Sequence, residues 1–93
     1  MFSINVTYRA KDGDTLRRFY DDITAEGIAA VTRTEEGCVL YEFYFSAERD
    51  NELLLMEKWA DRTAQEHHDV MPHMVKLMEI KERYSIETSI EEV

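Results

Sequence analysis

The sequence predicts an α+β fold in which helices cover one face of an antiparallel sheet. Near both ends of the chain, apolar and polar residues alternate with the period of a strand that has one buried face. Two more segments rich in strand-forming residues lie between them, and two segments with helical spacing separate the strands. The order is strand, helix, strand, strand, helix, strand, which is the ferredoxin-like split βαβ arrangement.

The first strand is expected over residues 2–9, because side chains there alternate between apolar and polar with period two. Its apolar face carries Phe2, Ile4, Val6 and Tyr8. A turn follows the strand. Asp12 or Asp14 could cap the next helix by accepting a backbone hydrogen bond.

One long amphipathic helix is expected from Leu16 to Arg33, where apolar residues recur at helical spacing. Gly27 lies inside this segment, and a glycine there costs about 1 kcal/mol relative to alanine. We therefore expect Gly27 to permit a close approach of another element or a slight kink. Gly37 should end the helical region, because glycine readily adopts a positive φ.

Two strands over residues 38–45 and 52–59 are expected to form a hairpin around Asp50 and Asn51. Side chains alternate between the two faces of a strand. One face of the second strand carries Leu53, Leu55, Glu57 and Trp59, and the other carries Leu54, Met56 and Lys58.

Asp61 can cap a short helix that reaches about His67, and Pro72 suits the first turn of a second helix that ends near Ile80. The last strand is expected over residues 84–90, where apolar and polar residues alternate. Helices cover one face of such a sheet, and the other face carries large groups. We expect a second copy of the chain to cover that face in a symmetric homodimer.

With 93 residues, the chain has room for one hydrophobic core, and we expect a single domain over residues 1–93. The net charge of −9 argues against nucleic acid and anionic membranes as partners, because phosphate binding needs clustered basic residues. Cys38 is the single cysteine and cannot form an intrachain disulfide. No signal-peptide pattern and no run of roughly 20 apolar residues is present, so we expect the cytoplasm.

Several short motifs lie at fixed spacing. They are Glu36-Gly37-Cys38 followed by Tyr41, the pair Glu57-x-Trp59, His68 nine residues after Trp59, and Pro72-His73. With these motifs the chain resembles the antibiotic-biosynthesis-monooxygenase superfamily, in particular its small quinol-monooxygenase-like members. The resemblance covers about residues 2–90 and implies a dimeric α+β barrel with a pocket between sheet and helices in each subunit. It also implies cofactor-free oxygenation of quinols or anthrones, although related branches isomerise a phosphorylated sugar or degrade haem.

His68 is the candidate for proton chemistry, because a neutral imidazole near pH 7 can take a proton from a phenol or an enol. The resemblance places the corresponding histidine at the pocket, and the alternative is a histidine that fixes the helix to the sheet. His67 must point elsewhere on the helix, towards solvent. His73 could reach the pocket rim and the substrate, or the dimer contact. The spacing of these histidines is not i, i+4, so no metal site is expected.

Trp59 and Glu57 are candidate substrate contacts. Trp59 could stack on a planar substrate, or it could pack in the core. Glu57 shares a strand face with apolar residues, so its carboxylate needs a partner if that face is covered. It could orient His68, pair with Arg62 or accept backbone hydrogen bonds.

The resemblance adds Asn5 as a second candidate catalytic residue, because an asparagine on this strand can bind substrate oxygen or dioxygen in related enzymes. An exposed polar residue on a half-buried strand is the alternative. Tyr41 is a candidate substrate contact, although aromatic residues at strand spacing also form cores and dimer surfaces. The acidic pair Glu35 and Glu36 is expected to be solvated surface.

The function predicted from these residues is a cofactor-independent monooxygenase acting on a small quinol or a related electron-rich aromatic substrate, with dioxygen. His68 would remove a phenolic proton, and the resulting anion could pass an electron to dioxygen without a cofactor. Two alternatives stay open. One is a non-catalytic dimer that binds a small molecule or serves in stress physiology, and the other is an isomerase that uses the same histidine without dioxygen.

Overall fold

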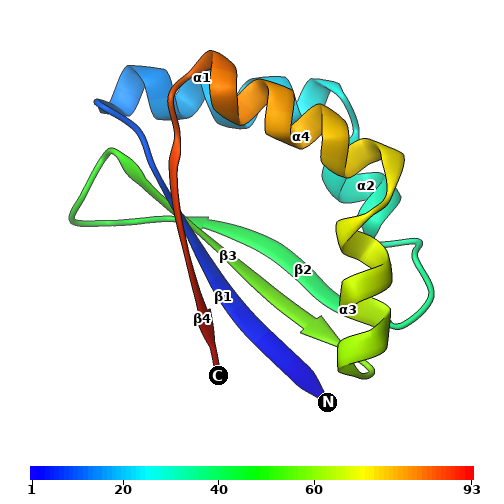
Figure 1. The fold of residues 1–93 in the computed structure, drawn as a ribbon. Helices are drawn as coiled ribbons and strands as arrows, with labels where there is room; N and C mark the ends of the chain where they lie inside the picture. The colour runs from blue at the N-terminus through cyan, green and yellow to red at the C-terminus, as the bar shows by residue number, and fades with distance from the viewer.

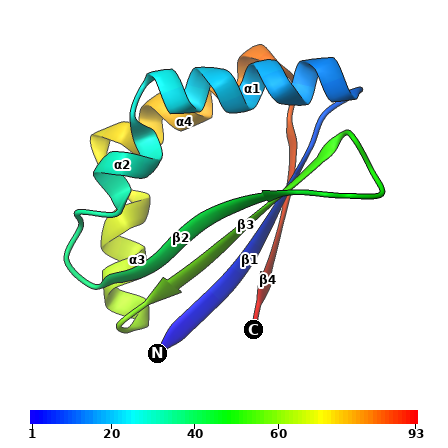
Figure 2. The ribbon, with the colours of Figure 1, turned by 180° about the vertical axis from the view of Figure 1, so that it is seen from behind.

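The computed structural model describes all 93 residues as a four-stranded sheet with four helices on one face (Figure 1 and Figure 2). The elements are β1 (Phe2–Arg9), α1 (Gly13–Ala25), α2 (Ile28–Thr32), β2 (Cys38–Phe45), β3 (Glu52–Trp59), α3 (Arg62–Asp69), α4 (Pro72–Arg83) and β4 (Glu87–Glu92). All strand pairs are antiparallel, in the order β2-β3-β1-β4. The predicted ferredoxin-like fold is confirmed. None of the helices combines the length and apolar character needed to cross a bilayer.

The core lies between the sheet and the helices, where 15 buried hydrophobic residues form one cluster. Every second residue of β3 is buried, and the buried ones are those that the alternation predicts. Ile4 on β1 is paired with Glu57 on β3, and Val6 with Leu55. This register places Glu57 on the helix-facing side of the two central strands.

The predicted long helix is divided in two, so that expectation was wrong. Asp12 caps α1 by accepting the Thr15 amide at 2.8 Å, and the helix ends at Ala25. Gly27 then adopts a left-handed φ of +67°, which no α-helix can contain. No atom lies within 4 Å of the position of a Cβ on Gly27. Glycine is needed there to end the helix, and not to admit a neighbouring element.

Gly37 ties the turn between α2 and β2 to α3. Its φ is +85°, as expected for a glycine that ends a helical region, and a Cβ there would lie 2.6 Å from the Cβ of Ala64. The Gly37 carbonyl also accepts the Ala60 amide at 2.8 Å. The turn is therefore packed directly against the start of α3.

The last strand begins at Glu87, later than the expected start at Tyr84. Helix α4 continues past the predicted end, and Tyr84 is its last capping residue. The Tyr84 hydroxyl donates to Asp22 on α1 at 2.6 Å, and Ser85 has a φ of +52°. The bond to Asp22 holds Tyr84 at the end of α4, and the strand therefore begins only after the turn at Ser85. All residues of β4 are exposed.

Candidate active site

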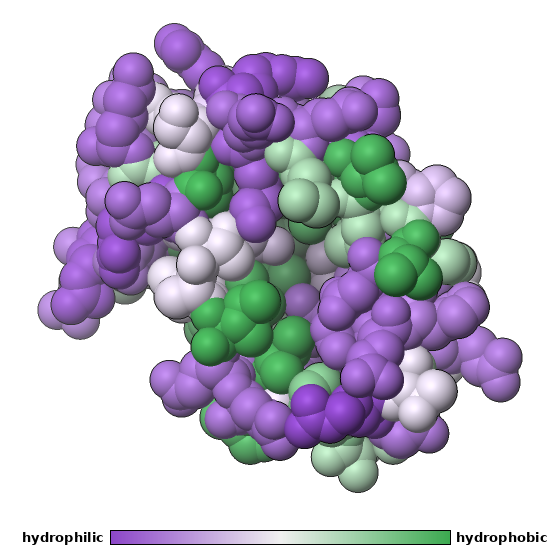
Figure 3. Space-filling view, viewed as in Figure 1, coloured by the Kyte–Doolittle hydropathy of each residue, from purple (hydrophilic) through white to green (hydrophobic).

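A pocket of about 400 Å³ lies between the sheet and helices α3 and α4, within the size range of small-molecule sites. Figure 3 shows a hollow at the centre of this face, with apolar side chains beside it and hydrophilic ones around it. The sheet supplies an apolar wall from β1 together with Tyr41 and Glu57. Helix α3 contributes His68, and the edge strand β4 lines the outer side.

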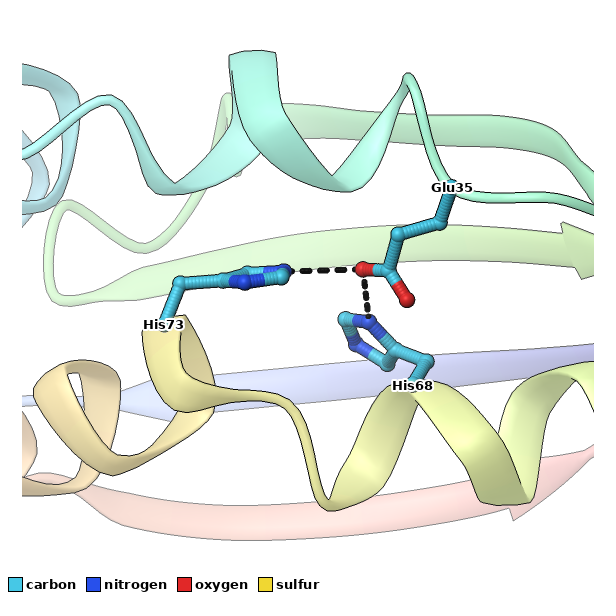
Figure 4. Close-up of side chains that lie close together, drawn as sticks. All are labelled: Glu35, His68 and His73. Carbon is cyan, nitrogen blue, oxygen red and sulfur yellow. Dashed lines mark hydrogen bonds and ion pairs between the residues drawn. The ribbon is translucent and has the colours of Figure 1, made fainter.

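Glu35 lies between His68 and His73 (Figure 4). One of its carboxylate oxygens, Oε2, is 2.7 Å from Nδ1 of His68 and 2.8 Å from Nε2 of His73. The exposed fractions of the three side chains are 6%, 2% and 13% respectively. The expectation that Glu35 is solvated surface was therefore wrong. The turn that Gly37 packs against α3 carries the carboxylate over the two histidines.

The contact with Glu35 sets which nitrogen of His68 can act as a base. A carboxylate only accepts hydrogen bonds, so His68 donates through Nδ1–H and keeps the lone pair on Nε2. Nε2 has no hydrogen-bond partner in the protein. Since every buried polar side-chain atom has a partner, Nε2 is not a buried atom. Because His68 lines the pocket, we infer that Nε2 reaches the pocket space.

Trp59 and Tyr41 both pack against the His68 ring. The Trp59 ring is tilted by 34° against the imidazole with centroids 4.7 Å apart, and Tyr41 meets it edge-on at 5.6 Å. Trp59 is fully buried behind His68 and is not part of the pocket lining, whereas Tyr41 lines the pocket. Burial raises the pKa of the Tyr41 hydroxyl, which keeps it neutral.

Glu57 lines the same pocket and is 5% exposed. It accepts the indole N–H of Trp59 at 3.0 Å, a partner outside the three expected ones. Arg62 instead bonds Glu92 at 2.9 Å, and Glu35 is the carboxylate that contacts His68. Burial raises the pKa of Glu57 from 4.5 to about 7, so this carboxyl can hold a proton near neutral pH.

Asn5 lies on the other face of the sheet. It is paired with Met56 and Glu91 and alternates with Ile4 and Val6, whose side chains face the helices. The structure therefore does not bring Asn5 to the pocket of its own chain, and its role in binding oxygen stays a prediction.

The same three side chains, Glu35, His68 and His73, are of types that ligate transition metals, and their ligand atoms lie within 4.8 Å of one another. The expectation that no metal site exists was drawn from the spacing of the histidines alone. That spacing carries no information about Glu35, which comes from a distant turn. The two N···O separations are hydrogen-bond distances, shorter than the roughly 3.3 Å between neighbouring ligand atoms around a tetrahedral zinc ion. His68 and His73 are thus placed as hydrogen-bond donors to the carboxylate of Glu35.

Comparison with known proteins identifies one family. The family described as antibiotic biosynthesis monooxygenase matches residues 1–80. A conserved protein of unknown function from Bacteroides thetaiotaomicron, described as a possible oxidoreductase, is similar with a TM-score of 0.84 and 21% identity, covering 99% of this chain and 94% of that one. A protein from Deinococcus radiodurans, named as a candidate antibiotic biosynthesis monooxygenase, is similar with a TM-score of 0.83 and 18% identity, covering 98% and 89%. At these identities the two structures share the fold.

An uncharacterized protein from Synechocystis sp. is 35% identical over 48 residues. The match covers 52% of this chain and 33% of the relative, so the two proteins share only part of their lengths.

Proposed function

Because the chain belongs to the antibiotic biosynthesis monooxygenase family, we propose that it is a cofactor-independent monooxygenase acting on a small quinol or a related electron-rich aromatic substrate. The observation that carries the proposal is the Glu35–His68 contact of 2.7 Å beside the pocket. It gives the pocket a base of fixed tautomer at Nε2 of His68.

In the first step, Nε2 of His68 takes the phenolic proton of the substrate. The imidazolium that forms keeps its Nδ1–H bond to Glu35, and the carboxylate offsets the new positive charge. Tyr41 and Trp59 hold the ring in place while the proton moves. Glu35 is therefore a positioning residue, and His68 is the catalytic base.

In the second step, the substrate anion passes one electron to dioxygen, the radical pair combines to a peroxide anion, and this anion takes the proton back from His68 to give a hydroperoxide. Loss of water from this hydroperoxide leaves a quinone that carries one new oxygen atom. The second oxygen atom leaves as water, so that quinol and dioxygen give hydroxyquinone and water, and the substrate supplies all four electrons. The apolar wall from Ile4, Val6 and Leu77 limits water beside the anion.

The proposal includes a homodimer. The sheet face away from the helices carries Leu54 and Met56, both half-buried, and no helix of the chain covers that face (Figure 2). A second copy packed sheet to sheet would bury these side chains. The proposed location is the cytoplasm, where the net charge of −9 would help to keep so small a protein in solution.

The test is dioxygen consumption by the purified, metal-stripped protein with a small panel of quinols that includes menadiol. His68→Ala should lower turnover by roughly 10²- to 10⁴-fold, the usual contribution of a general base. His67→Ala is the matched control, because His67 is an exposed neighbour on the same helix. Full turnover in His68→Ala would refute the assignment of the base.

No uptake above autoxidation across the panel would refute the oxygenase. In that case, conversion of an enolisable substrate without dioxygen would favour the isomerase, which needs the same base and the same pocket.

A further inference from the structure

Lys81 on α4 is the charged residue of the pocket lining that has no hydrogen-bonding partner in the protein. The other charged residues of the lining are each bonded: Glu57 to Trp59, Arg62 to Glu92, Asp69 to Gln65, and His68 to Glu35. The Nζ atom of Lys81 lies 5.7 Å from the centroid of the Tyr8 ring. This cation–π contact leaves the N–H donors of the ammonium group without an acceptor.

The other basic residues of α4 have acidic partners. Lys76 pairs with Glu79 at 3.9 Å, and Arg83 pairs with Asp22 at 2.7 Å. Burial lowers the pKa of Lys81, and no carboxylate nearby offsets that effect. Since every buried polar side-chain atom has a partner, the unpartnered Nζ of Lys81 must be accessible, and a ligand in the pocket that carries a negative charge could bind it there.

The face of α4 that lines the pocket is formed by Met74, Leu77 and Lys81, at helical spacing. His68, on α3, lies close to the start of α4, with its ring centroid 5.8 Å from that of His73. Lys81 lies seven residues after Met74, which corresponds to about 10 Å along the helix axis. The pocket therefore has a basic nitrogen at one end, an ammonium group at the other, and apolar side chains between them.

We propose that Lys81 binds an acidic group of the substrate, so that the substrate is a phenol or quinol that carries a carboxylate. The proposal rests on the proposed function for the phenol that faces His68. A single free lysine balances one negative charge, whereas a phosphate monoester would call for further unpaired donors. Arg62, the other basic residue of the lining, is already bonded to Glu92.

The test compares the binding of two probes, hydroquinone and 2,5-dihydroxybenzoate, by calorimetry under anaerobic conditions. The wild-type protein should bind 2,5-dihydroxybenzoate about tenfold more tightly, the effect expected of a charge-assisted hydrogen bond. Lys81→Met should lose this preference while its affinity for hydroquinone stays the same. Lys76→Met is the matched control on the same helix and should keep the preference.

Equal affinity for the two probes in the wild-type protein would overturn the proposal, and so would failure of both to bind at millimolar concentration. A preference that persists in Lys81→Met would also overturn it. Displacement of 2,5-dihydroxybenzoate by equimolar inorganic phosphate would assign the site to phosphate instead of carboxylate.

The binding measurement and the turnover measurement fail independently. A Lys81-dependent preference without dioxygen consumption would leave the carboxylate site standing and remove the oxygenase. Dioxygen consumption with hydroquinone but without the preference would do the opposite.

Discussion

Oε2 of Glu35 and Nδ1 of His68 are 2.7 Å apart, although the two residues are separated by 33 positions in the chain. Both side chains are almost fully buried at this contact. Because a carboxylate cannot donate, the contact decides which nitrogen of the imidazole carries the proton. Glu35 thereby keeps Nε2 of His68 available to the pocket.

Replacing Glu35 by glutamine should lower kcat with little change in KM. The amide can donate to His68 and favour the wrong tautomer, and loss of such a supporting group costs roughly 10- to 100-fold in activity. The measurement is dioxygen consumption over a range of quinol concentrations, with thermal unfolding of each variant alongside. Glu36→Gln removes the same charge from an exposed neighbour and should leave kcat intact. An equal loss in both variants would refute the positioning role.

Glu57→Gln should stabilise the protein at alkaline pH. Burial raises the pKa of Glu57 from 4.5 in the unfolded chain to about 7 in the fold, so the folded state binds the extra proton between these values. The stability from this group is complete below pH 4.5 and is lost as the pH rises through 7. Glutamine keeps the acceptor for Trp59 without the charge. We expect a gain of about 3 kcal/mol near pH 8 and none near pH 4, measured by urea unfolding.

The two glycines with left-handed backbones should respond differently to alanine. Gly27→Ala meets only the conformational cost, about 1 kcal/mol, because no atom lies within 4 Å of the new Cβ. Gly37→Ala meets that cost and also a contact of 2.6 Å with Ala64, so we expect about 3 kcal/mol in total. Free energies of unfolding from urea titration test the difference. Equal losses would show that the turn at Gly37 is not packed against α3.

The proposed dimer predicts that Leu54→Lys lowers the mass in solution to that of one chain, because it places a charge in the sheet-to-sheet contact. Sedimentation velocity at micromolar concentration measures the mass. Val75→Lys is the control, since Val75 is an exposed apolar residue on the outer side of α4. A wild-type protein that sediments as a single chain would refute the dimer.

Local patterns were sufficient to predict most of the fold. Alternation identified the two faces of β3. Asp61 was recognised as a helix cap and the first cap was narrowed to Asp12 or Asp14, because a cap depends on residues close in sequence. Gly27 could not be resolved in the same way, because apolar spacing continues across it. Tyr84 was assigned to a strand because its bond to Asp22, far away in the chain, leaves no local signal.

The candidate site was harder to predict, because its parts come from distant segments. His68 was recognised from its spacing to Trp59, whereas nothing near Glu35 indicates that a turn carries it over α3. The glycine beside it, Gly37, was the one available signal. Lys81 could have been found, because it continues the apolar face of α4 at the spacing of a helix.

Strand β4 lines one side of the pocket, although none of its residues is buried, and β1 is the one strand that it pairs with. A segment with so little apolar burial opens more readily than the rest of the sheet. A ligand that contacts Thr88 and Ile90 would join this strand to α4 and supply the packing that the chain lacks. Amide hydrogen exchange in β4 should then slow when the pocket is filled, and unchanged exchange would mean that the ligand binds elsewhere. Exchange in this exposed edge strand would thus report whether the pocket is occupied.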